Sequence, residues 1–149
     1  MANYIKAIFA AVSAFILARL GILAPWVGVL ILAMVLDYAT GMTAAWATST
    51  LNSRTGIIGV VKKLLYIVMV IVAMIADWAI SQGGAYIGVQ IKAQGFVALL
   101  VIVWLLVNEL ISILENIGRI GAHYPDWFLT LLKRLKQTTE DQGKEVLPK

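Results

Sequence analysis

The 149-residue sequence contains no cysteine, a single histidine and only three prolines. Without cysteine, the chain can form no disulfide and no thiolate metal site, and one histidine, His123, cannot build a histidine-rich one. Charged residues make up 13% of the chain, whereas soluble domains usually carry about 25%. The sequence therefore has too little polar surface to cover an ordinary water-soluble globule.

Apolar residues are abundant instead, at 61% of the chain, and the mean hydropathy is +0.89. At about 1.5 Å per helical residue, segments of about 20 residues match a hydrocarbon core of about 30 Å. We therefore predict an all-α integral membrane protein with four transmembrane helices, whose membrane domain covers residues 1–137. The predicted spans are about residues 5–23, 25–47, 60–80 and 95–117.

Three carboxylic acids, Asp37, Asp77 and Glu109, stand inside these apolar segments. A charge near the bilayer centre costs roughly 2.5–3.5 kcal/mol on insertion scales, so such residues mark helix contacts, water-filled paths or proton-sensitive sites. Asp37 and Glu109 lie about halfway along their spans and can share one depth. If they met with no cation nearby, one of them would be protonated. Asp77 lies near the far end of its span, where an interfacial position beside Trp78 is the simpler interpretation.

Small and polar residues accompany two of these acids. Gly41 follows Asp37 by one helical turn, which predicts a packing surface rather than a lipid-facing one. Beyond Glu109, a polar stripe runs along one helical face at i+3, i+7 and i+10. This stripe either holds the last span to its neighbours within one subunit, or it lines a subunit contact or water. Its residues are Ser112, Asn116 and Arg119, and Glu115 is placed to form an i, i+4 ion pair with Arg119.

Basic residues predict the orientation of the chain in the membrane. The predicted polar loop 48–63 contains Arg54, Lys62 and Lys63 and no acid, whereas the predicted loop 81–94 contains only Lys92. Because cytoplasmic loops are enriched in Lys and Arg, we predict a cytoplasmic N-terminus, 48–63 loop and C-terminus. Lys62 and Lys63 would then lie at the cytoplasmic edge, and would have to extend inward to pair with the buried acids.

The C-terminal region changes character after Pro125. Asp126 can cap a helix over 126–137 that is apolar on one face and basic on the other, as in helices that lie on anionic membranes. We predict that this helix lies on the inner leaflet and that the polar tail 138–149 is disordered. The residues predicted to lie at the membrane surface are Lys62, Lys63, Trp127, Lys133, Arg134 and Lys136.

Three local motifs occur in a fixed order. They are Asp37-Tyr-Ala-Thr-Gly41, then Asn52-Ser-Arg-Thr-Gly-Ile-Ile-Gly-Val-Val-Lys-Lys63, then Asn108-Glu-Leu-Ile-Ser-Ile-Leu-Glu-Asn-Ile-Gly-Arg-Ile-Gly121 with Pro125 after it. Together, and at this spacing, they resemble the phage-lysis and toxin-secretion holin family of bacteria and their phages. The resemblance covers about residues 27–136.

The resemblance implies a protein of the bacterial inner membrane that oligomerises with its own copies and opens a lesion. A cell-wall hydrolase or a toxin would cross through it. The residues that would serve assembly or permeation are Asp37, Gly41, Asn108, Glu109, Ser112, Glu115, Asn116 and Arg119.

The sequence offers no catalytic constellation, and Gly56 and Gly59 are too sparse for a nucleotide-binding loop. We therefore predict no enzyme activity, no cofactor, no metal and no nucleic-acid partner, since the basic residues fit topology and anionic lipid instead. Two other classes remain open. An ion- or proton-coupled transport or channel subunit would show specific conductance without a large lesion. A regulatory membrane protein, such as an inhibitor of a holin, would oligomerise without killing the cell.

Overall fold

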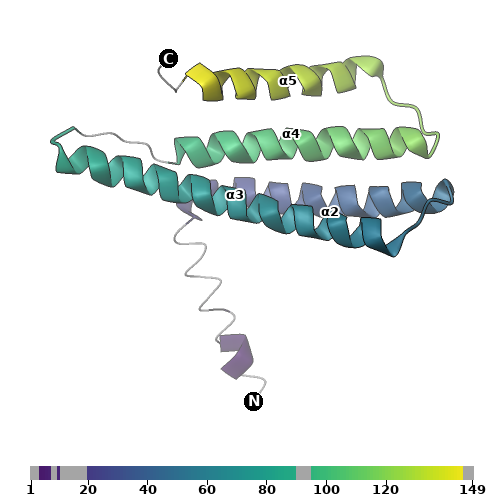
Figure 1. Cartoon of the computed structure of the whole chain (residues 1–149), viewed down its shortest axis with the longest axis horizontal. Helices are drawn as coiled ribbons and strands as arrows, with labels where there is room; N and C mark the ends of the chain where they lie inside the picture. The colour runs from purple at the N-terminus through teal and green to yellow at the C-terminus, as the bar shows by residue number, and fades with distance from the viewer. Residues whose placement is uncertain (1–3, 8–9, 11–19, 90–94, 146–149) are drawn as a thin grey trace.

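A computed structural model describes residues 4–7, 10, 20–89 and 95–145, and this part of the chain contains helices and no strand (Figure 1). A short 3-10 turn, η1 (Gly21–Leu23), leads into helix α2 (Ala24–Ala47). Three further helices follow, which are α3 (Ser53–Tyr86), α4 (Phe96–Arg119) and α5 (Asp126–Glu145). The all-α prediction is therefore confirmed for the described residues.

Three stretches in the described ranges are long and apolar enough to cross a membrane, namely Gly21–Ala47, Gly56–Tyr86 and Phe96–Arg119. They correspond to the predicted spans 25–47, 60–80 and 95–117. The predicted span 5–23 falls mostly on residues 8–9 and 11–19, which lie outside the described part of the chain. A multi-pass membrane protein is therefore the architecture that these helices support.

Helix α3 is longer at both ends than the sequence indicated. Asn52 caps its start, because the Asn52 side-chain Oδ1 accepts a hydrogen bond of 3.0 Å from the backbone N–H of Arg54. The prediction of a polar loop before the span 60–80 is therefore wrong over residues 53–59, and the predicted loop 81–94 is wrong up to Tyr86. The glycines and polar residues near the start of α3 are typical of a loop, whereas Asn52 is typical of the residue that caps a helix start.

Helix α4 is the central element and packs against α2, α3 and α5 (Figure 1). Helices α2 and α4 run in the same direction and α3 runs against them, so the α2–α3 and α4–α5 connections lie at one end of the bundle. Where α2, α3 and α4 meet, apolar side chains form the main core. Its buried residues are Leu23, Leu30, Met34, Val70, Ala73, Ala98, Ile102 and Leu105.

The outer faces of α2 and α3 are apolar and exposed. Leu32, Val35, Leu64 and Val72 each expose between 57% and 60% of their surface. An apolar surface of this extent marks a membrane or protein contact rather than a face in water. Lipid is the natural solvent of these two helices.

Helix α5 packs along α4 rather than standing apart from the bundle (Figure 1). Leu132 of α5 is buried against Val107 and Leu114 of α4. Farther along, the Trp104 indole Nε1–H of α4 donates a 2.9 Å hydrogen bond to Oε1 of Glu140, and Nζ of Lys136 lies 5.7 Å from the centre of the Trp104 ring. Through these contacts, polar residues in the second half of α5 bind Trp104 of α4.

The predicted disorder of 138–149 is therefore wrong for residues 138–145, which continue α5. Residues 146–149 lie outside the described ranges. The apolar residues on the other side of α5, among them Trp127 and Leu135, remain exposed. Whether they lie on lipid stays a prediction.

Candidate functional site

Three helices place one charged residue each at the same level of the bundle. Asp37 lies ten residues before the end of α2, Glu109 ten before the end of α4, and Lys63 ten after the start of α3. Because α3 runs against the other two, all three residues lie about 15 Å from the same end, at 1.5 Å per residue. This is about half the thickness of a hydrocarbon core of about 30 Å.

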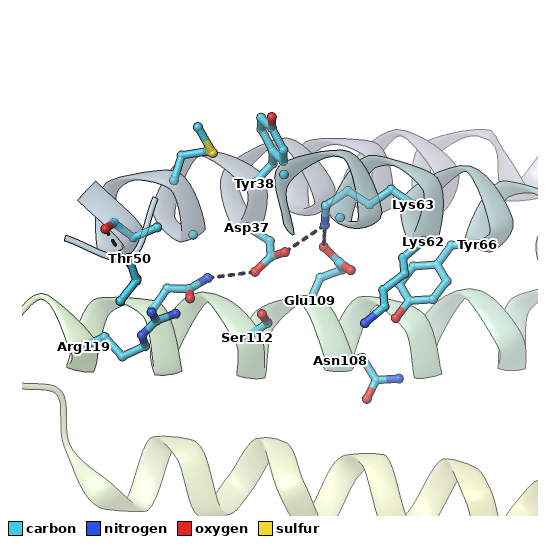
Figure 2. Close-up of a pocket in the computed structure, with 16 residues that line it drawn as sticks. Asp37, Tyr38, Thr50, Lys62, Lys63, Tyr66, Asn108, Glu109, Ser112 and Arg119 are labelled. Carbon is cyan, nitrogen blue, oxygen red and sulfur yellow. Dashed lines mark hydrogen bonds and ion pairs between the residues drawn. The ribbon is translucent and has the colours of Figure 1, made fainter. Parts of the chain in front are cut away.

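The three charges meet through one ammonium group. Nζ of Lys63 lies 2.9 Å from Oδ2 of Asp37, and it also donates a hydrogen bond to Oε2 of Glu109 (Figure 2). The Asn116 Nδ2 donates to the other Asp37 oxygen, Oδ1, at 3.1 Å. We call Asp37, Lys63, Glu109 and Asn116 the charge network. It ties α2, α3 and α4 together.

The prediction that Asp37 and Glu109 share a depth is confirmed, because both carboxylates reach the same Lys63 ammonium. The placement of Lys63 at the membrane surface is wrong, since its side chain is mostly buried and lies ten residues inside α3. A cation thus compensates the two acids, a condition that the sequence left open. Removing one partner of such a buried group leaves an uncompensated charge, which typically costs about 3–5 kcal/mol.

Gly41 lets α2 and α4 approach at the charge network. A Cβ atom at Gly41 would lie 3.4 Å from Nδ2 of Asn116. The same Nδ2 is 3.4 Å from Oγ1 of Thr40, one residue earlier. The predicted packing face of α2 therefore lies against the amide that orients Asp37.

A cleft of about 620 Å³ lies beside the charge network, between α2, α3 and α4 (Figure 2). The predicted polar stripe of α4 lines it, and so does Asn108. Glu115 does not, and it forms no ion pair with Arg119 within the described residues. An i, i+4 pair contributes only about 0.2–0.5 kcal/mol, too little to hold Arg119 away from the cleft. Seven of the eight predicted assembly residues thus lie in this region: Asp37, Gly41, Asn108, Glu109, Ser112, Asn116 and Arg119.

Asp77 forms a second polar site, far along α3 from the charge network. Its Oδ1 accepts the backbone N–H of Val97 at 3.0 Å, and its Oδ2 accepts that of Ala98 at 2.8 Å. The residue is 6% exposed and is bound within the protein at the start of α4, so its interfacial depth stays a prediction. Asp77 caps the first turn of α4 from a neighbouring helix. No local sequence pattern indicates this cap, because Asp77 and the N–H groups that it binds lie 20 or 21 positions apart.

Within the described residues, no group of three or more His, Cys, Asp or Glu residues is placed to hold a metal ion. Chemically, the charge network joins three apolar helices and leaves cationic and hydrogen-bonding groups facing the cleft. Such a site suits helix assembly and polar-ligand contact.

Comparison with known proteins agrees with this architecture. Residues 14–137 match the model of the bacteriophage holin family. An uncharacterized protein of Halalkalibacterium halodurans is 37% identical over 131 residues, which cover 88% of this chain and 85% of that protein. A probable holin of Bacillus phage phi105 is 30% identical over 91 residues, or 61% of this chain and 59% of that protein. No solved structure matches.

Proposed function

The chain belongs to the bacteriophage holin family, and on that premise we propose that it oligomerises in a bacterial inner membrane and opens a lesion. A cell-wall hydrolase or a toxin, the partner that this role requires, would cross there. The proposal includes a fourth span formed by the first apolar segment, and cytoplasmic N- and C-termini. Single cysteines at Ser53, Val89 and Gln142 test the orientation, because only Val89→Cys should react with an impermeant label from outside.

The observation that carries the proposal is the charge network at mid-helix, next to a polar cleft. Charged residues at such a depth are expensive and usually functional. Within one subunit, Lys63 binds both acids and reduces the two buried negative charges to a net of one, which lowers the cost of inserting a monomer. The polar stripe that borders it gives the three spans one face that can meet another polar face, or water, once copies assemble.

Helix α5 adds a second element to the proposal. Packed along α4, it would hold Lys133, Arg134 and Glu140 beside a membrane span, where charges are costly. We propose that in the membrane α5 moves to the anionic inner leaflet, where its basic residues and Trp127 are favourable. The face of α4 that includes Val107 and Leu114 is then free for another copy.

The test is induced expression in a bacterium, with membrane potential and release of a co-expressed cell-wall hydrolase followed together. After a delay, we expect the membrane potential to collapse and the hydrolase to be released at the same time. Asp37→Asn and Glu109→Gln, combined with Lys63→Met so that no buried charge is left unpaired, should still insert but should alter crosslinked oligomer size and the time of collapse. Lys144→Gln, at an exposed pair with Asp141, serves as the control.

Other results would favour other functions. Loss of potential with the hydrolase retained would indicate a channel or transport subunit. Stable oligomers without loss of potential would indicate a regulator of lysis. Wild-type timing in the Asp37/Lys63/Glu109 variant would limit the charge network to holding one subunit together.

A further inference from the structure

The cleft beside the charge network contains more positive charge than the network uses. Its lining includes three cations, Lys62, Lys63 and Arg119, and two carboxylates, Asp37 and Glu109. Both carboxylates are engaged by Lys63. Lys62 and Arg119 form no ion pair or hydrogen bond through their side chains with any other described residue. Lys62 and Arg119 thus have no direct partner among the described residues, and the five charged side chains of the lining leave a net charge of +1.

Neutral hydrogen-bonding groups accompany these cations, with Ser112 between them and Asn108 beside Lys62. Figure 2 shows Ser112 and Asn108 on α4, with Arg119 toward one end of the cleft and Lys62 toward the other. The hydroxyl of Ser112 and the amide of Asn108 also make no side-chain hydrogen bond to a described residue, and no buried polar atom there lacks a partner. These four side chains are therefore accessible from the cleft and available to a ligand.

The ligand that fits is an acceptor-rich anion. Guanidinium and ammonium groups bind phosphate oxygens through short charge-assisted hydrogen bonds, and Arg can do so in a bidentate way. A volume of about 620 Å³ lies within the usual range of ligand pockets, about 300–1,000 Å³. We infer that this cleft binds a phosphate-bearing headgroup, whose phosphate and hydroxyl groups reach between Lys62 and Arg119, with Ser112 and Asn108 as neutral donors.

The position of the cleft favours a phospholipid as the source of that phosphate. The lining runs from Thr50 and Arg119, at the ends of α2 and α4, inward to Tyr66 and Asn108. The ends of membrane-spanning helices lie among lipid headgroups, and basic pockets between such helices bind anionic ones. This argument holds for either orientation of the chain, and it does not require that the protein form a lesion.

The full-length chain, purified in a neutral detergent, tests the inference by native mass spectrometry. Phosphatidylglycerol and phosphatidylcholine are added at equal concentration, and bound lipid is counted. We expect one phosphatidylglycerol to be retained in preference to phosphatidylcholine. Lys62→Gln with Arg119→Gln should reduce its retention about tenfold or more, the factor that corresponds to about 1.4 kcal/mol. Helicity and elution volume verify that this variant is folded.

The matched control removes the same charge elsewhere. Lys133→Gln with Arg134→Gln changes two exposed cations of α5 that do not line the cleft, so retention should be unchanged. Equal losses in the two double variants, or equal retention of the two lipids by the wild type, would overturn the inference. If the glutamine variant does not fold, the single variants Lys62→Gln and Arg119→Gln take its place; each should reduce retention of phosphatidylglycerol, and unchanged retention in both would overturn the inference.

Competition with inorganic phosphate shows whether the ligand is a lipid headgroup or free phosphate. If millimolar phosphate displaces the lipid from the wild type, and its effect disappears with Lys62→Gln and Arg119→Gln, the site is a phosphate site that free phosphate also fills. If phosphate has no effect while the lipid result holds, the headgroup of a membrane lipid is the ligand.

Discussion

Asp77 and the pair of Asp37 and Glu109 are carboxylates in the same apolar bundle, yet different donors compensate them. Two backbone N–H groups of α4 bind Asp77, one to each oxygen. A single side chain, Lys63, binds Asp37 and Glu109. The first site joins α3 to the start of α4, and the second joins three helices in the middle of the bundle.

The difference lies in how each site can change. Backbone donors at a helix start are fixed by the helix itself, so the Asp77 site holds as long as α4 exists. The charge network depends on one flexible lysine beside an open cleft, so its carboxylates can exchange partners with water, a ligand or another copy. We therefore interpret Asp77 as a structural joint and the charge network as the adjustable site.

The largest effect is expected for Lys63→Met. This change leaves both carboxylates buried without their cation, and the free energy of unfolding should fall by about 3–5 kcal/mol. Loss of helicity with increasing dodecyl sulfate in mixed micelles measures it. Lys62→Met is the matched control, because the neighbouring lysine has no ion pair in the described structure, and it should change stability by less than about 0.5 kcal/mol.

A triple variant separates lost pairing from lost packing. Asp37→Asn and Glu109→Gln, added to Lys63→Met, remove the stranded charges and should recover most of the stability. No recovery would mean that the lysine stem, rather than its charge, supports the three helices. Equal stability of Lys63→Met and Lys62→Met would remove the charge network as a stabilising feature.

The second effect concerns Asp77. Asp77→Ala leaves the N–H groups of Val97 and Ala98 without acceptors in a buried place, which should cost about 2–3 kcal/mol in the same measurement. Asp77→Asn keeps one acceptor oxygen and should cost less. The loss should add to that of Lys63→Met, because the two sites share no partner. Strong non-additivity would contradict the division into two independent sites.

The sequence predicted the apolar helices well and their connections poorly. The long hydrophobic runs predicted the ends of α2 and α4 to within two residues, because a helix that crosses lipid needs a continuous apolar stretch. Helix α3 was predicted too short because Gly56 and Gly59 are typical of loops. Asn52 is a residue type that often caps helix starts, and it could have indicated the true beginning. Because the predicted helix began too late, Lys63 was predicted at the membrane edge, although it lies ten residues inside α3.

The candidate site was predictable on each helix but not between helices. Helical spacing grouped Glu109, Asn116 and Arg119 correctly, because periodicity is a property of one helix. The Asp77 cap and the bond from Trp104 to Glu140 join residues 20 or more positions apart. Such contacts follow from tertiary packing, which no local pattern encodes.

The third prediction tests the close approach of α2 and α4. Gly41→Ala places a Cβ 3.4 Å from Nδ2 of Asn116, the near edge of ordinary van der Waals contact, so the bond from Asn116 to Asp37 should persist and the alanine should stabilise the helix by about 0.5–1 kcal/mol. Gly28→Ala is the matched control on the same helix, where no described residue lies within 4 Å of the added atom. It should stabilise the protein by about 0.5–1 kcal/mol, since Ala favours a helix over Gly. The two alanines should therefore both raise the unfolding midpoint, and a lower midpoint for Gly41→Ala alone would show that the Asn116 amide cannot accommodate the added Cβ.

The smallest effect on global stability is expected at α5, which surface contacts hold against α4. Glu140→Ala removes the acceptor of the Trp104 indole, and the free energy of unfolding should change by less than about 1 kcal/mol because that bond is exposed. The local effect should be larger: amide hydrogen exchange over residues 136–145 should become faster while α2, α3 and the rest of α4 are unchanged.

Asp141→Ala provides the control for this local effect, because the neighbouring acid pairs only with the exposed Lys144. It should leave exchange in α5 close to that of the wild type. If release of α5 frees α4 for assembly, Glu140→Ala should also advance the time of potential collapse after induction, and Asp141→Ala should not. Faster exchange without earlier collapse would separate the docking of α5 from assembly. Identical exchange in the two variants would show that Leu132 and its apolar neighbours, rather than Trp104, hold the helix in place.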